Sequence, residues 1–178
     1  MTTACSSTDR ADSTPIPGTW HVDVERSHAR FVAATLLGAV KVSGVFGSLS
    51  GSLVVGAQGA SGALAIDAAS VDTSNRLRDR HLRGRDFFAV AQHPHLRYEL
   101  RSLTPGTGDL VRLEGDLVVA GTRTTLPLEA TLQPLADGGA QIACRTRVDR
   151  VALGVRGARA MVPRTVELDV AVVLRPAD

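Results

Sequence analysis

The chain has 178 residues, which is enough for one domain with a substantial hydrophobic core. Its hydrophobic content is 44% but only 3% of its residues are aromatic, so its interior has to be lined mainly by Val, Leu and Ala. Small aliphatic side chains fill space less completely than rings do, and this composition favours a cavity. A net charge of +2 argues against nucleic-acid binding over the whole surface.

Residues 1–18 are polar, and we expect them to form a disordered leader before a single domain at residues 19–178. The leader has no run of about seven apolar residues, as a signal peptide would need. No stretch approaches the ~20 apolar residues of a membrane-spanning helix. The sequence therefore predicts a cytoplasmic protein without a membrane span. Cys5 and Cys144 are predicted to be free thiols because they suggest no disulfide framework.

After Trp20 the sequence alternates apolar and polar residues in runs separated by Gly, Pro and Asp, which predicts an all-β domain. The connections are short, and short connections favour antiparallel neighbours. Eight or nine such strands can form either a sandwich or a closed barrel, and alternation does not separate the two. The strands are expected near residues 19–25, 29–37, 39–56 (bent at Gly44 or Gly47), 62–69, 95–103, 109–120, 122–133, 139–150 and 164–175.

The alternation fails in one long connection, from Ser70 to Pro94. Its first residues are helix-capping types, because their side-chain oxygens can accept the unpaired amide hydrogens of a first helical turn. Leu77 and His81 then fall four residues apart on one helical face, and Gly84 ends the turn. The sequence thus predicts short helical turns within residues 72–92. A long, basic connection with two phenylalanines is suited to cover a barrel mouth.

This connection contains Asp72-Thr73-x-Asn75, then Arg78-Asp79-x-His81-Leu82, then Asp86-Phe87-Phe88. The order of these residues resembles the YceI-like family, the lipocalin-like polyisoprenoid-binding proteins. The resemblance covers residues 20–175 in family order. Two positions depart from the family pattern, because Arg26 and Thr35 stand where the family usually has histidines. The residues that carry the resemblance are Trp20, Asp23, Ser27, Phe31, Gly44, Phe46, Gly51, Ser70, Asp72, Thr73, Asn75, Arg78, Asp79, His81, Leu82, Asp86, Phe87, Phe88, Pro94, Gly115, Asp116, Leu117, Gly121, Asp149, Arg150 and Gly154.

The resemblance implies a single antiparallel lipocalin-like barrel of about eight strands, a width that side chains can fill or that can hold one small ligand. It also implies that the protein binds, sequesters or transports a long apolar lipid, of the isoprenoid quinone or polyprenyl type, without catalysis. A homodimer is a further implication. For each inward residue an ordinary packed core is the alternative. The predicted ligand-binding residues are Phe31, Val42, Phe46, Leu53, Ile66, Leu77, His81, Leu82, Phe87, Phe88, Leu96 and Tyr98.

Several polar residues leave alternatives open. The arginines of residues 76–85 suit a phosphate head group, but aspartates nearby can balance them in a solvated loop. His81 can face a ligand head group or donate to a backbone carbonyl. Arg78 and Asp79 are expected to be structural, tying the connection to the barrel. Phe87 and Phe88 are expected to diverge, one packing into the barrel and the other onto the outside of a strand.

The main alternative function is a cyclase or isomerase that acts on an apolar substrate in the same cavity. Its polar groups would be Tyr98, Asp79 and His81. No serine stands in a nucleophile elbow, and His93 and His95 are separated by a proline and lack a third ligand. We therefore predict no catalytic residue, no metal site, no cofactor apart from the bound lipid, and no nucleic-acid partner. A titratable side chain deep inside the cavity would favour the enzyme.

Overall fold

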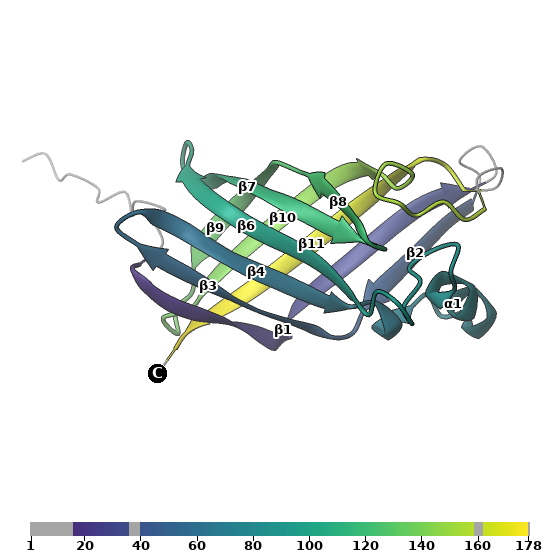
Figure 1. The fold of residues 1–178 in the computed structure, drawn as a ribbon. Helices are drawn as coiled ribbons and strands as arrows, with labels where there is room; N and C mark the ends of the chain where they lie inside the picture. Colours follow the sequence, from purple (N-terminus) through teal and green to yellow (C-terminus); the bar gives the residue numbers. More distant parts are fainter. Residues whose placement is uncertain (1–15, 36–39, 159–161, 178) are drawn as a thin grey trace, which may run out of the picture.

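The computed structural model describes residues 16–35, 40–158 and 162–177. They form a closed antiparallel barrel with one short helix, as the sequence predicts (Figure 1). The barrel wall has eight strand positions, which are called staves below. The leader predicted for residues 1–18 lies outside the described residues as far as residue 15.

The strands follow the alternating segments of the sequence closely. Their bounds are β1 (Gly18–Thr35), β2 (Val40–Phe46), β3 (Leu49–Gly56), β4 (Gly59–Asp67), β5 (Val71–Asp72), β6 (His95–Pro105), β7 (Leu110–Val119), β8 (Thr122–Thr125), β9 (Leu128–Pro134), β10 (Ala140–Asp149) and β11 (Thr165–Pro176). Within the described residues the helical elements are the 3-10 turn η2 (Ala68–Ser70) and the helix α1 (Arg76–Arg83).

The barrel closes because β11 pairs with β10 on one side and with β1 on the other. Two staves are each made of two strands. β2 and β3 pair with successive parts of β1, and β8 and β9 pair with successive parts of β7. Every pairing is antiparallel, and among the described residues β8 pairs with β7 alone, so one edge of β8 has no ladder partner. α1 lies across one end of the barrel, and β11 ends at the other (Figure 1).

Three predicted strand boundaries are wrong, each for a local reason. The segments 19–25 and 29–37 are one continuous strand as far as Thr35, interrupted only by a bulge. The segment 39–56 is broken at Gly47 and Ser48, where the backbone bonds to Ser70. The segment 122–133 is broken at Leu126–Pro127, because proline has no amide hydrogen for the ladder.

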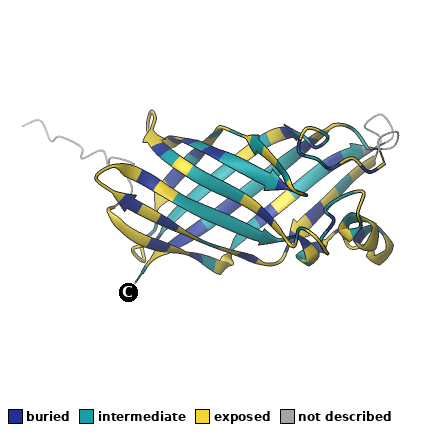
Figure 2. Cartoon of the chain, viewed as in Figure 1, coloured by how far each residue is buried: buried dark blue, intermediate teal, exposed yellow. Residues whose placement is uncertain are grey.

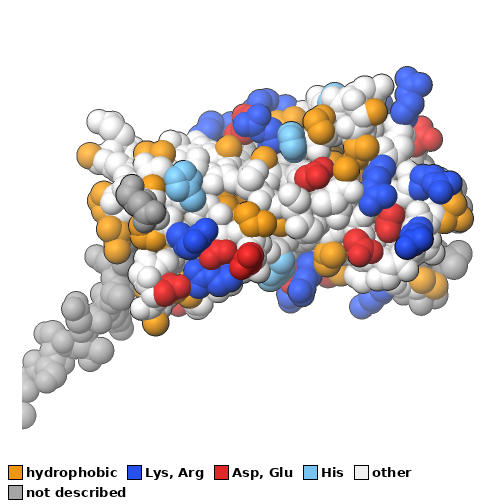
Figure 3. Space-filling model, turned by 90° about the horizontal axis from the view of Figure 1, so that it is seen from below, with side chains coloured by type: hydrophobic (Ala, Val, Ile, Leu, Met, Phe, Trp, Pro, Cys, Tyr) orange, Lys and Arg blue, Asp and Glu red, His pale blue; other side chains and the backbone are white. Residues whose placement is uncertain are grey.

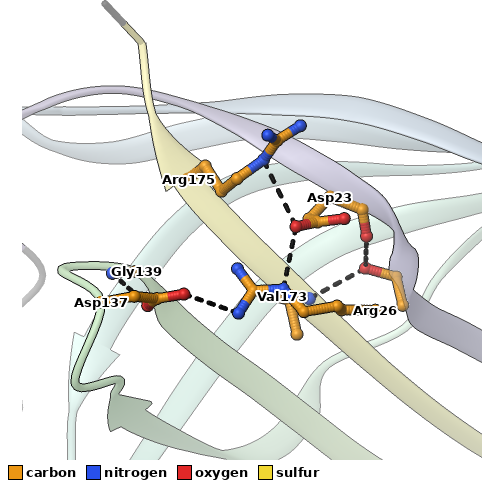
Figure 4. Close-up of polar contacts among 7 residues, drawn as sticks. Asp23, Arg26, Asp137, Gly139, Val173 and Arg175 are labelled. Atoms are coloured by element: carbon orange, nitrogen blue, oxygen red, sulfur yellow. Dashed lines mark hydrogen bonds and ion pairs between the residues drawn. The ribbon is translucent and has the colours of Figure 1, made fainter.

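The bulge in β1 is held by side chains at the seam between β1 and β11 (Figure 4). The Ser27 hydroxyl donates to the Asp23 carbonyl at 2.6 Å and accepts the Val173 amide at 2.9 Å. Arg26 bridges Asp23 and Asp137, at 2.9 Å and 2.6 Å. These arginine contacts hold the pKa of each carboxyl below its usual range. These side-chain contacts therefore hold β1 and β11 together where the backbone ladder is interrupted. The role of Arg26 here is structural, through its ion pairs with Asp23 and Asp137.

The hydrophobic core consists of two clusters, one towards each end of the barrel. The cluster near α1 contains Phe46, Val71 and Leu96, and the other contains Trp20, Leu53 and Val111. Between them, many inward residues of the staves keep intermediate exposure (Figure 2). Partial exposure inside a closed barrel means that the interior is hollow.

The connection between β4 and β6 folds as local capping rules predict. Asn75 caps α1 by accepting the Arg78 amide at 3.0 Å, and the Gly84 amide bonds back to the His81 carbonyl at 3.0 Å. The Asp72 carboxylate accepts the Ser74 amide at 2.7 Å and shapes the turn before the helix. The helical turns expected within residues 72–92 are therefore confirmed, with α1 as the one complete helix of the described chain.

Candidate ligand-binding cavity

A cavity of about 810 Å³ runs along the inside of the barrel. Its volume is in the upper part of the ~300–1,000 Å³ range usual for ligand pockets. Almost all of the lining is aliphatic or aromatic. The middle of the wall comes from alternate residues of the staves, namely Leu64, Leu100, Leu117, Ile142, Cys144, Leu168, Val170 and Val172.

All twelve predicted ligand-binding residues line this cavity. Seven are inward residues of the staves, and five come from the connection that carries α1. Contact of these residues with a ligand stays a prediction. Val40 does not line the cavity and is 45% exposed. Val40 opens β2, just beyond the part of the wall that encloses space.

The two ends of the cavity differ. At the end away from α1, the lining residues Leu53 and Leu174 are buried, and Trp20 and Val111 are buried beside them. Trp20 is held there by a hydrogen bond from its indole to the Ile16 carbonyl, at 3.1 Å. At the α1 end, Leu77 lines the cavity although 62% of its surface is exposed. A residue can do both only at a rim, so the cavity opens at α1.

Phenylalanine rings surround the cavity near its opening. The Phe46 centroid lies 5.8 Å from Phe31 and 5.7 Å from Phe88, the latter in an edge-to-face arrangement. Phe87 instead packs against Gly157, so closely that a Cβ there would overlap the ring. The rings of Phe87 and Phe88 thus diverge as expected. The position predicted for the second ring is wrong, because Phe87 packs on another connection, not on the outside of a strand, and also lines the cavity.

The described residues 150–158 and 162–164 form the other side of the opening, and Arg150 organises them. Arg150 is only 5% exposed, and its guanidinium donates to the backbone carbonyls of Val155, Gly157, Val162 and Pro163 at 2.7–2.8 Å. Arg150 is one of the family-like residues, but its sequence context predicts no role for it. Only a structure can show a single side chain that satisfies several carbonyls of one loop.

A buried polar cluster anchors α1 to the barrel. The Asp79 carboxylate accepts the Thr73 amide at 2.9 Å and the Thr73 hydroxyl at 2.6 Å. Arg78 donates to the Thr73 hydroxyl oxygen and carbonyl, both at 2.7 Å. The hydrogen bonds from Thr73 lower the pKa of Asp79, so this carboxyl is ionised at neutral pH. The structural role predicted for Arg78 and Asp79 is confirmed, and Thr73 is the residue they share.

Two titratable side chains face the middle of the cavity. The Tyr98 hydroxyl donates to the Leu126 carbonyl at 3.0 Å, and burial raises the pKa of Tyr98 to about 12. Burial also raises the pKa of the Cys144 thiol above its usual value. Both groups are therefore neutral at pH 7. Cys144 was missed as a lining residue, although it alternates with Ile142 and Thr146 along β10.

His81 lies at the rim. It lines the cavity, its side chain is exposed, and its ring makes no hydrogen bond to the described residues. The geometry therefore leaves both ring nitrogens available to a ligand head group. The structure contradicts the alternative in which the His81 ring donates a hydrogen bond to a backbone carbonyl.

Neither a metal cluster nor a spanning helix is found in the part of the chain that the structure describes. His, Cys, Asp and Glu side chains nowhere gather in threes there as a metal ion would need. No described helix combines the length and the apolar character needed to cross a bilayer.

Comparison with known proteins agrees with the geometry. A sequence model of the YceI-like domain matches residues 20–174. Protein YceI of Escherichia coli O157:H7 is 37% identical to the chain over 67 residues, which are 38% of this chain and 35% of that protein. Protein YceI of Shigella flexneri is 36% identical over 67 residues, with the same coverage. The matching segment thus spans about a third of the length of these curated relatives.

Solved structures share the fold over most of the chain. Burkholderia cenocepacia BcnA superimposes with a TM-score of 0.76 and 19% identity, over 85% of this chain and 98% of that chain. A polyisoprenoid binding domain from Saccharophagus degradans gives 0.74 and 16%, over 89% and 98%. The Campylobacter jejuni YceI protein gives 0.63 and 20%, over 77% and 85%. At these identities the likeness shows the fold alone.

Proposed function

The chain belongs to the YceI-like domain family, and from that premise we propose that it binds a long apolar isoprenoid lipid inside its barrel. The lipid would be an isoprenoid quinone or a polyprenyl derivative, sequestered or carried without chemical change. The proposal is supported most directly by one observation, the hollow interior of about 810 Å³ with its almost wholly apolar lining.

The cavity volume sets the scale of the ligand. A heavy atom with its hydrogens occupies roughly the ~30 Å³ that a water molecule takes in the liquid, so the cavity has room for about 27 heavy atoms. At ~0.3 kcal/mol per atom, a tail of that size contributes ~8 kcal/mol, which corresponds to a micromolar complex. A forty-carbon chain would extend beyond the opening at α1. Affinity should therefore rise with chain length and level off near ~25–30 carbons.

Two further features support a lipid ligand. The Saccharophagus degradans protein with the same fold is a polyisoprenoid binding domain. In this chain the polar side chains that line the cavity near its rim include Asn75, Arg78 and His81, while the buried end is apolar. This arrangement suits a tail that enters first and a polar head group that stays beside His81 at the opening.

The enzymatic alternative finds little support in the interior. A general acid or base works best when its pKa is near the working pH. Tyr98, with a pKa of about 12, already donates its proton to a backbone carbonyl, and burial keeps the Cys144 thiol protonated. Asp79 is committed to Thr73. Simple binding therefore explains the cavity with fewer assumptions than a cyclase or isomerase does.

The test is to identify what the protein carries and what it takes up. Protein purified under native conditions would be extracted with organic solvent and the extract examined by mass spectrometry. Binding of isoprenoid quinones of increasing tail length would then be measured by titration calorimetry. We expect a stoichiometric lipid and an affinity that levels off with tail length. Absence of any lipid, together with no uptake of added quinone, would refute the proposal. Conversion of the quinone during incubation would favour the enzyme.

A further inference from the structure

Charge is distributed unevenly between the two ends of the barrel. The connections at the α1 end, residues 68–94 and the described part of 150–164, carry eight arginines and three aspartates, a net charge of +5. The connections at the opposite end, residues 57–58, 106–109 and 135–139, carry two aspartates and no basic residue. Basic side chains are accordingly prominent at the α1 end of the molecular surface (Figure 3). The opening of the cavity thus has a positive rim.

Most described arginines of the barrel wall pair with an acidic side chain, whereas in this rim only Arg164 is seen to do so, with Asp149. Arg76, Arg80, Arg85 and Arg156 are exposed and form no ion pair with any described residue. An arginine already paired within the protein is less available to an external anion. Among the residues that the structure describes, the arginines with an acidic partner are Arg26, Arg101, Arg112, Arg123, Arg145, Arg147, Arg164 and Arg175.

The aspartates of the 68–94 connection neutralise the rim only in part. Asp79 is buried and accepts hydrogen bonds from Thr73, and the Asp72 carboxylate accepts the Ser74 amide. Arg76 and Arg80 lie one helical turn apart and line a cleft between α1 and β5. Two exposed guanidinium groups at that spacing present their donors to anionic oxygens outside the protein.

The positive rim also carries apolar surface. Leu77 stands between the unpaired arginines on α1, is 62% exposed and lines the mouth of the cavity. Exposed leucine beside arginines is the pattern of a segment that lies at a membrane surface, with the charges at the phosphates and the apolar group in the interface. A lipid that leaves a bilayer at this point would avoid exposure of its tail to water.

We propose that the α1 end of the barrel docks on an anionic lipid bilayer, with the rim arginines at the phosphate head groups and the cavity opening towards the membrane. Docking would serve to load and release an apolar lipid. This purpose rests on the function proposed above. Docking itself depends only on the rim. It can therefore be tested on the protein without added ligand.

The experiment is co-sedimentation with vesicles of phosphatidylcholine alone, or of phosphatidylcholine with about one third phosphatidylglycerol. The wild-type protein should bind the anionic vesicles at about 0.05 M salt, release them at about 0.5 M, and not bind the neutral ones. Arg76→Gln/Arg80→Gln should weaken binding about 30-fold, the change expected from ~1 kcal/mol per arginine near the surface. Arg112→Gln/Arg175→Gln removes the same charge at the opposite end and should change binding less than about threefold.

Two results would overturn the proposal. One is no preference of the wild-type protein for anionic over neutral vesicles. The other is an equal loss of binding in the two double variants, which would show that net charge matters and the rim does not. Circular dichroism and melting temperature would confirm that both variants are folded. Quinone binding in vesicle-free solution should be unchanged in both. A wild-type protein that docks but neither carries a lipid nor takes up quinone would refute the proposed function alone.

Discussion

Filling the middle of the cavity should weaken ligand binding by an amount that the structure sets. Cys144 faces the cavity from β10, and tryptophan at this position adds about eight side-chain heavy atoms. At ~30 Å³ each they would take ~240 Å³, about a third of the available 810 Å³. A ligand that loses contacts for as many of its own atoms, at ~0.3 kcal/mol each, loses ~2.4 kcal/mol. Cys144→Trp should therefore bind a long-tailed quinone about 60-fold more weakly.

The matched control is Arg147→Trp, because Arg147 lies on the same strand but points outwards, with 73% of its side chain exposed. Its ion pair with Glu167 is on the surface, where such pairs contribute little. Titration calorimetry would give the affinities, and thermal melts would show whether each variant folds. The ring at position 144 enters empty space, so stability should stay within about 1–3 kcal/mol of wild type. A folded Cys144→Trp protein with wild-type affinity would show that the ligand binds outside the cavity.

Three other perturbations test the parts of the site. Phe46 is 8% exposed and packs against two other rings. Phe46→Ala should therefore lower the stability by ~3–5 kcal/mol and the melting temperature by roughly 6–20 °C. A shift of only a degree or two in the melting temperature would contradict the core role of Phe46. His81→Ala should weaken binding of a quinone and leave the melting temperature unchanged, because the ring is exposed and bonds to no described residue. The third perturbation is Thr73→Val, which removes a hydrogen bond to Asp79. The pKa of Asp79 is lowered in the folded protein, so the contribution of Asp79 to stability is present above about pH 4 and is lost as pH falls through the lowered value. Thr73→Val should therefore destabilise the protein near pH 7, and urea unfolding should show the difference from wild type shrinking below about pH 4; a constant difference would refute the assignment.

The sequence was most informative where side chains alternate. Period-two patterning identified the staves and the inward residues, since the alternation reflects which face of a strand is covered. It misread the polar run from Arg26 to His28 as a gap between two strands. That run is a bulge, and it continues the strand because the Ser27 hydroxyl takes the place of a backbone partner for Val173. Such a substitution depends on a strand more than a hundred residues away, which no local pattern contains.

The polar supports of the opening were only partly predictable. Arg78 and Asp79 could be assigned a structural role because an ordered, polar connection needs internal hydrogen bonds. Local sequence patterns did not identify Thr73 as the partner that Arg78 and Asp79 share, and they did not predict that Arg150 is buried. In the sequence Arg150 is one basic residue among twenty, and its burial becomes visible only when the carbonyls of its own loop surround it.

The hollow interior follows from where the few large side chains lie. An eight-stranded barrel is just wide enough to be filled by side chains, so a cavity needs a deficit of volume in the middle. The chain has six aromatic residues, and five of them are at the ends: Trp20 at the buried end and Phe31, Phe46, Phe87 and Phe88 around the opening. Only Tyr98 faces the middle, where its partners are Val, Leu, Ile and Cys. Aromatic rings thus close one end and narrow the other, while small aliphatic side chains leave the space between them for a ligand.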